Sequence, residues 1–144
     1  MADFVFNVSK GAAAEKVRDD PTKLGALILK TAESDAAMKR RATVAAILTA
    51  STEANFTNYA RKTGVIGTVT VDNTNDRVDV DMPDQTWSSA GGATNNTTAK
   101  LVVFYDEGGT DTTRIPLVGL DFVATTTGVD LVWQLATAGF YRAS

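Results

Sequence analysis

The carboxylates of this chain are the side chains best placed to do chemistry, and they are densest between residues 72 and 84. Asp72, Thr74 and Asp76 stand at the first, third and fifth positions of an EF-hand calcium loop. The pattern then fails, because Arg77 takes the place of the invariant glycine and Pro83 that of the bidentate glutamate. The alternative is a solvated strand face, whose charges also discourage edge-to-edge strand pairing. We favour this alternative and expect no metal and no cofactor.

The residue types that are missing narrow the chemistry further. The chain contains no histidine and no cysteine. This excludes Ser-His-Asp triads, thiol nucleophiles, histidine acid–base catalysis and most zinc sites. It also means that no disulfide staples the fold. A glycosidase would need two carboxylates opposed across a cleft, and no isolated pair stands out. We therefore expect a protein that is not an enzyme and has no catalytic residues.

Charge and hydropathy argue against two classes of partner. The formal net charge of -3 disfavours a general nucleic-acid binder. The basic runs at 39–41 and 61–62 could contact phosphate, but no aromatic residues are interleaved with them, so we interpret them as solvated helix faces. No apolar run approaches the roughly 18 residues that span a bilayer, and the start of the chain lacks the basic segment of a signal peptide. We expect no nucleic-acid partner and no membrane partner.

Residues 68–82 carry the clearest structural signal. Apolar and polar residues alternate along two runs that are separated by Asn-Thr-Asn-Asp at 73–76, a cluster of turn formers. This pattern predicts a β-hairpin with one buried face and one solvent-exposed, acidic face. We expect Val69, Val71, Val78 and Val80 on the buried face, and Asp79 and Asp81 facing solvent.

The first third of the chain favours helices and the remainder favours strands. Residues 12–20 predict a short helix closed by Pro21. Residues 34–50 predict a longer helix, capped by Ser34 or Asp35. The apolar run 24–30 fits a strand or a helix equally. A loop is expected at 88–98 and strands at 99–105, 114–118, 121–125 and 130–135, the last three separated at Gly119 and Gly128.

These signals predict a single domain over residues 1–144. An N-terminal arm and helical part should cover about 1–54, and a β part about 55–144. We expect an α+β, mainly β fold: an antiparallel β-sandwich or jelly-roll-like domain with one or two short helices in the N-terminal third.

The aromatic residues could form a platform on which a carbohydrate stacks, but in a β domain such residues more often belong to the hydrophobic core. Phe104 and Tyr105 should point to opposite faces of one strand. The aromatic residues at the two chain ends lie where a lone domain usually frays. We expect these to be partner contacts: Phe4, Phe6, Phe140 and Tyr141. The alternative is that both ends add strands to the protein's own sheet.

Several segments together carry a resemblance that the individual residues do not. They are NYARKT (58–63), DNTNDRVDVDMPDQTW (72–87), KLVVFYD (100–106), IPLVGLDFVATTTGVDL (115–131) and AGFYRAS (138–144). These segments resemble a family of small virion structural proteins of tailed bacteriophages, of the minor capsid or head-decoration type. The likeness covers most of residues 55–144; before that, only FNVSKG and LILK are similar. The motifs are packing and turn motifs without a catalytic signature.

The resemblance implies a non-enzymatic capsid decoration (cement) protein. Such a protein would bind the outer surface of the major capsid protein lattice, and it would be made in the cytoplasm of the bacterial host. Many copies of a modest interface would reinforce the lattice, and homo-oligomerisation fits the symmetry of capsids. The alternatives are a tail or head-fibre component and, in a different class, a carbohydrate-binding module.

Overall fold

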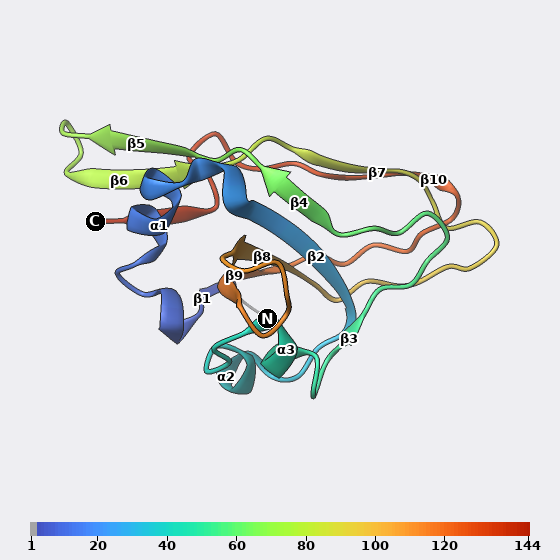
Figure 1. The fold of residues 1–144 in the computed structure, drawn as a ribbon. Coiled ribbons are helices and arrows are strands. Elements are labelled where there is room, and N and C mark those ends of the chain that lie inside the picture. The colour runs from blue at the N-terminus through green and yellow to red at the C-terminus, as the bar shows by residue number, and fades with distance from the viewer. Residues whose placement is uncertain (1–2) are drawn as a thin grey trace.

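A six-stranded antiparallel sheet forms the centre of the molecule (Figure 1). The computed structural model describes residues 3–144. Within them, the strand order is β1-β9-β8-β2-β3, and β4 also pairs with β2. The strands of this sheet are β1 (Phe4–Val5), β2 (Leu24–Thr31), β3 (Thr52–Glu53), β4 (Lys62–Val65), β8 (Lys100–Asp106) and β9 (Arg114–Asp121).

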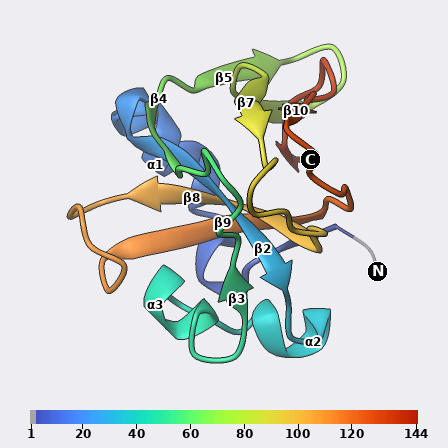
Figure 2. The same cartoon turned by 90° about the vertical axis from the view of Figure 1, so that its right-hand side faces the viewer.

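Smaller elements cover the central sheet from both sides (Figure 2). On one side lie a three-stranded sheet of β5 (Thr68–Asp72), β6 (Arg77–Asp81) and β11 (Tyr141–Ala143), a pair of β7 (Gln85–Ala90) and β10 (Val129–Trp133), and helix α1 (Ala13–Asp19). On the other side lie α2 (Asp35–Met38) and α3 (Val44–Ile47). Short 3₁₀ turns occupy Asn7–Ser9 and Pro21–Lys23. The expected α+β, mainly β, sandwich-like fold is confirmed. Among residues 3–144, no helix is both long and apolar enough to cross a membrane.

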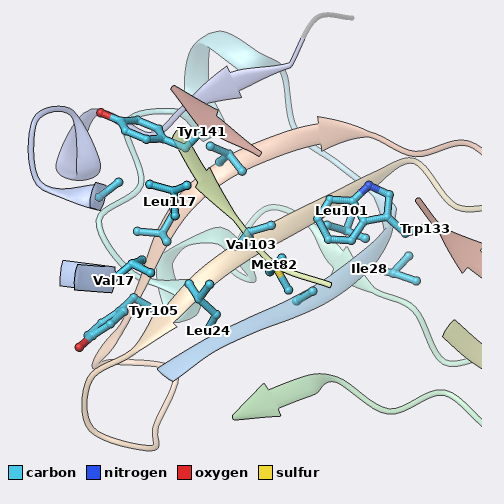
Figure 3. Close-up of a cluster of buried hydrophobic side chains, with 14 of the residues drawn as sticks. Val17, Leu24, Ile28, Met82, Leu101, Val103, Tyr105, Leu117, Trp133 and Tyr141 are labelled. Carbon is cyan, nitrogen blue, oxygen red and sulfur yellow. The ribbon is translucent and has the colours of Figure 1, made fainter. Parts of the chain in front are cut away.

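Strands β2 and β8 are buried on both of their faces. Successive side chains of a strand point to opposite faces, so Leu24 and Ile28 enter one core while Leu27 and Leu29 enter the other. The first core is drawn in Figure 3 and includes Val17 of α1 and Tyr141 of β11. The run 24–30 is therefore a strand, and it is apolar from Leu24 to Leu29 because neither face of that part meets water.

The aromatic residues of the β part lie mainly in these cores. Phe104 and Tyr105 point to opposite faces of β8, as predicted, and both are buried. Trp87 and Trp133 are buried in the first core, and the Trp87 indole N–H donates to the carbonyl of Ala60 at 2.7 Å. Residues so enclosed offer no flat stacking surface for a sugar ring.

The prediction of a single helix over residues 34–50 is wrong, because the chain forms two separate short helices there. Ser34 caps α2 as expected, accepting a hydrogen bond from the N–H of Ala37. Thr43 then adopts an extended conformation, with φ -141° and ψ 159°, and caps α3 by accepting from the N–H of Ala46. A threonine hydroxyl that caps a new helix competes with continuation of the old one, and this accounts for the break.

The strand boundaries near the C-terminal end also differ from the prediction. Strand β9 continues through Gly119, which was expected to separate two strands. The reason is the ring of Phe4, since a Cβ at position 119 would lie 2.6 Å from the Phe4 ring. The expected strand at 121–125 is reduced to an isolated bridge between Thr97 and Thr125. The loop predicted at 88–98 begins only after Ala90, where β7 ends.

The predicted hairpin forms, but its apolar face is only half covered. Strands β5 and β6 pair with Val69 opposite Val80 and Val71 opposite Val78. Val80 is fully buried, whereas Val71 is 64% exposed. The expectation that all four valines share a buried face is therefore wrong, because the outer end of the hairpin projects past the core (Figure 1).

The acidic face of the hairpin also differs from the expectation of free solvent exposure. The carboxylate of Asp79 accepts hydrogen bonds from Arg77 at 3.0 Å and from Arg142 of β11 at 2.8 Å. Asp81 is half-buried and accepts from the N–H of Met82 at 2.8 Å. These side chains do lie on the face opposite the valines, but they are held by neighbours there.

We predict that aspartate at position 80 is far more damaging than aspartate at position 71. Val80→Asp removes buried apolar area and buries a charge, so it should lower the free energy of unfolding by at least about 3 kcal/mol. Val71→Asp, on the same face of the same hairpin, should change it by less than about 0.5 kcal/mol. Urea denaturation of dilute protein measures both values. Equal losses would contradict the half-covered face.

Candidate partner-contact surface

Both chain ends are built into the protein's own sheets. Strand β1 pairs with β9, placing Phe4 opposite Gly119, and β11 pairs with β6, placing Tyr141 opposite Val80. The segments near both ends therefore add strands to the protein's own sheets. This is the arrangement that we gave as the alternative to partner contact. Phe6 is fully buried and Tyr141 is 9% exposed, so both belong to the cores. Partner contact by the chain ends stays a prediction, and it now concerns mainly Phe4 and Phe140.

Phe4 and Phe140 come together on the surface although they are far apart in sequence. Both are half-buried, and both line a hollow of about 200 Å³. We call this the terminal hollow; its lining residues are Asp3, Phe4, Val5, Val118, Leu120 and Phe140. A second hollow of about 270 Å³ shares Asp3, Leu120 and Phe140 with it and extends to Trp133. The result is a largely apolar depression formed by both ends of the chain and β9.

The ring of Phe4 lies on the face of β1 opposite to Val5 and is held firmly there. The Phe4 ring packs edge-to-face on Phe6, with ring centroids 5.1 Å apart, and it covers Gly119 of β9. The ammonium of Lys100 lies 5.2 Å from the centre of the same ring. A cation close to an aromatic face is attracted by the ring quadrupole. Phe4 is thus fixed from three directions before any partner arrives.

Lys100 is the charged centre of this region, and its side chain is fully buried. Its ammonium lies 2.6 Å from Asp121 Oδ1 and 3.1 Å from Asp35 Oδ1. Burial of a charge is costly unless it is paired, and here carboxylates from β9 and α2 supply the pairing. The hydrogen bond from Lys100 holds the pKa of Asp121 below its ordinary value. The backbone N–H of Asp121 also donates to Asp3, which ties the start of the chain to this centre.

Sequence reasoning missed the Lys100 centre. The sequence did contain one signal, which is the lysine at the start of the strongly apolar run AKLVVFY. In a strand that is buried on both faces, the ammonium group of a lysine cannot reach water, so it needs counter-charges within the fold. The two carboxylates lie far from it along the chain. The pairing of β8 with β9 sets Lys100 opposite Asp121, and the packing of α2 on the sheet brings Asp35 to the same ammonium.

The basic runs that might have contacted phosphate are used within the fold. Arg61 donates to both carboxylate oxygens of Glu53 and also to Asp111, while Arg41 donates to both oxygens of Glu33. The bond with Glu53 is the main cause that raises the pKa of Arg61, and Arg61 in turn lowers the pKa of Asp111. Run 61–62 is not a helix face, because it leads into β4. Arg41 and Arg61 are thus paired and half-buried, whereas Arg40 of the first run is exposed.

The carboxylates of the hairpin turn have a structural role. Asp72 accepts hydrogen bonds from the backbone N–H groups of Thr74 and Asn75 and from the Asn75 side chain. The side-chain bond is the main cause that lowers the pKa of Asp72. In residues 3–144, no group of three or more acidic, histidine or cysteine side chains is arranged to hold a metal ion. The turn geometry by itself accounts for the conformation of Asp72.

No protein-family model matches this chain, and neither a curated protein nor a solved structure matches it. The function proposed for the protein must therefore be argued from its own residues and their arrangement.

Acid should weaken the fold partly through Asp121. Its pKa is lowered in the folded state relative to about 3.9 in the unfolded chain. Its contribution is therefore present above pH 4 and is lost as the pH falls through the folded-state pKa. We predict that Asp121→Asn is less stable than the parent at pH 7 and loses less stability between pH 7 and pH 3. Urea midpoints across this pH range measure the effect.

The matched control for this titration is Asp76→Asn. Asp76 is an exposed turn residue with φ 51°, a conformation that asparagine also adopts. The control should keep the pH profile of the parent. If Asp121→Asn also kept the parent's full loss of stability in acid, the assigned role of the Lys100 pair would be wrong.

Proposed function

We propose that this protein is a non-enzymatic structural component of a tailed-phage virion, and specifically a decoration protein bound to the outside of the capsid lattice. The observation that carries the proposal is the terminal hollow, an apolar surface depression to which both chain ends contribute. Phe140 lies within AGFYRAS, and Phe6, which packs on Phe4, opens FNVSKG. Both segments resemble those of small virion proteins, so the resemblance and the surface feature coincide.

The disposition of polar groups supports a structural role. Lys100, Arg61, Arg41 and Arg114 are all paired with carboxylates of the same chain. Reactive sites commonly hold ionisable groups that are poised rather than mutually neutralised. Both tryptophans, Phe104 and Tyr105 lie in the cores, and this favours a packing protein over a carbohydrate-binding module.

A decoration protein of this kind would stabilise a capsid through repetition. The major capsid protein would present an apolar side chain to the terminal hollow, and Val5, Val118, Leu120 and Phe140 would surround it. Aromatic residues at the centre of an interface usually carry most of the binding energy. Many copies on one lattice convert a modest affinity into a stable shell. Assembly would take place in the cytoplasm of the bacterial host, where the chain is made.

The proposal is tested by binding to purified capsids that lack the protein. Phe140→Ser should reduce binding at least tenfold, about 1.4 kcal/mol, because it removes one wall of the hollow. Co-sedimentation across a concentration series measures the affinity. A melting curve of each variant shows whether it is folded under the assay conditions.

Ile66→Ser is the matched control, since Ile66 is 63% exposed and lies outside the hollow. It should bind capsids like the parent. Equal binding by both variants, or no binding of the parent to capsids, would contradict the proposal. A glycan array probed with the parent protein separates the capsid proposal from a carbohydrate-binding function.

A further inference from the structure

Strand β5 forms an open edge of the three-stranded sheet. The order of that sheet is β11-β6-β5, so β5 has a neighbour on one side only among the described residues. Figures 1 and 2 both show β5 along the upper border of the molecule, with no other described strand or helix above it. Along Thr68–Asp72 its outer side therefore pairs with no further described strand, although the N–H of Gly67, just before β5, donates to the carbonyl of Pro21 at 2.8 Å.

The backbone groups that face outward from β5 can be identified from the neighbouring strands. The carbonyl of Val80 accepts a hydrogen bond from the N–H of Phe140, at 2.9 Å, so the backbone of Val80 faces β11. Residues along a strand alternate in the side to which their backbone groups point. Asp79 and Asp81 therefore face β5 and bond Thr70 and Thr68. It follows that Val69 and Val71 point their N–H and C=O groups outward.

This edge lacks the features that usually protect an edge strand. Natural edges are blunted by proline, bulges or charged residues. Strand β5 has the sequence Thr-Val-Thr-Val-Asp, its pairing with β6 is regular, and its one charge lies at its end. The acidic residues that we expected to discourage edge pairing, Asp79 and Asp81, lie instead on β6, in the middle of the sheet.

The geometry points to a second copy of this chain as the occupant: β5 pairs antiparallel with β5 of the other copy, about a two-fold axis at Thr70. In this register Val69 of each copy lies opposite Val71 of the other. Both residues point their backbone groups outward, so the two copies exchange N–H···O=C bonds at both positions. Thr68 lies opposite Asp72, so no like charges oppose each other. The hydrogen-bond pattern and the charges of β5 are thus self-complementary.

The side chains of the apolar face fit the same arrangement. Val71, Val78 and Ala143 form one row across the sheet and border an open hollow of about 490 Å³. Pairing of two β5 strands continues this row into Val69 of the second copy. Val71 is the most exposed member of the row, and it gains an apolar neighbour. Apolar pairs opposite each other in adjacent strands stabilise a sheet.

The contact is short, so the dimer should be weak. One five-residue edge is much smaller than the roughly 800 Å² that each partner buries in a standard interface. We expect a reversible dimer that forms with increasing protein concentration. The pairing is independent of the proposed capsid binding, because β5 and the terminal hollow share no residue.

A charge-swap experiment at Thr70 tests the register. Thr70 is exposed and lies opposite its own counterpart at the two-fold axis. Like charges directly opposite each other destabilise strand pairing, so Thr70→Lys and Thr70→Glu should each weaken the dimer at least tenfold. An equimolar mixture of the two variants should restore dimerisation to the parent level or above. Sedimentation velocity over a concentration series measures all four samples.

Thr74→Lys and Thr74→Glu are the matched controls, because Thr74 is exposed in the turn and lies away from the axis. They should dimerise like the parent. A parent protein that stays monomeric over the whole series would overturn the inference. So would a dimer that tolerates both Thr70 variants, or a mixture that fails to restore the dimer.

Discussion

The burial of β2 and β8 on both of their faces is the constraint on which the rest of the structure depends. Two adjacent strands without a solvent face need a layer on each side. One layer is built from the two smaller sheets and α1, and the other from the start of the chain, α2 and α3. Helices α2 and α3 have four residues each, too few to be stable in isolation. They exist because Met38, Val44 and Ile47 complete the second core.

The same constraint dictates where the charges go. Lys100 begins β8, so it is enclosed with the rest of that strand and must find its counter-charges inside the fold. Asp121 lies opposite it on β9, and Asp35 comes from the first turn of α2. The ion pair thus joins the central sheet to one of its covering layers. Phe4 packs over the same lysine, so an electrostatic requirement of the core also helps to hold β1 on the central sheet.

Sequence patterns predicted what depends on neighbours along the chain. The alternation in 68–82 predicted a hairpin, Ser34 a helix cap, and AKLVVFY a strand; all three are present. The patterns failed where a distant residue decides the outcome. Gly119 continues a strand because Phe4 covers it, and Val71 is exposed because the core ends before it is reached. The terminal hollow could be anticipated only as aromatic residues at two chain ends, since nothing local shows that those ends meet.

The meeting of the two ends has a kinetic consequence. Ser9 donates a hydrogen bond to Pro116, 107 residues away, and β6 is completed only by β11 at the end of the chain. Contacts so distant in sequence form slowly, because the loops that they close are long. A nascent chain would carry the apolar strand β2 without its partner β8 until most of the protein had been synthesised. The central sheet should therefore be completed only after β8 and β9 have been synthesised, and until then the exposed β2 would be a natural substrate for chaperones of the cell in which the protein is made.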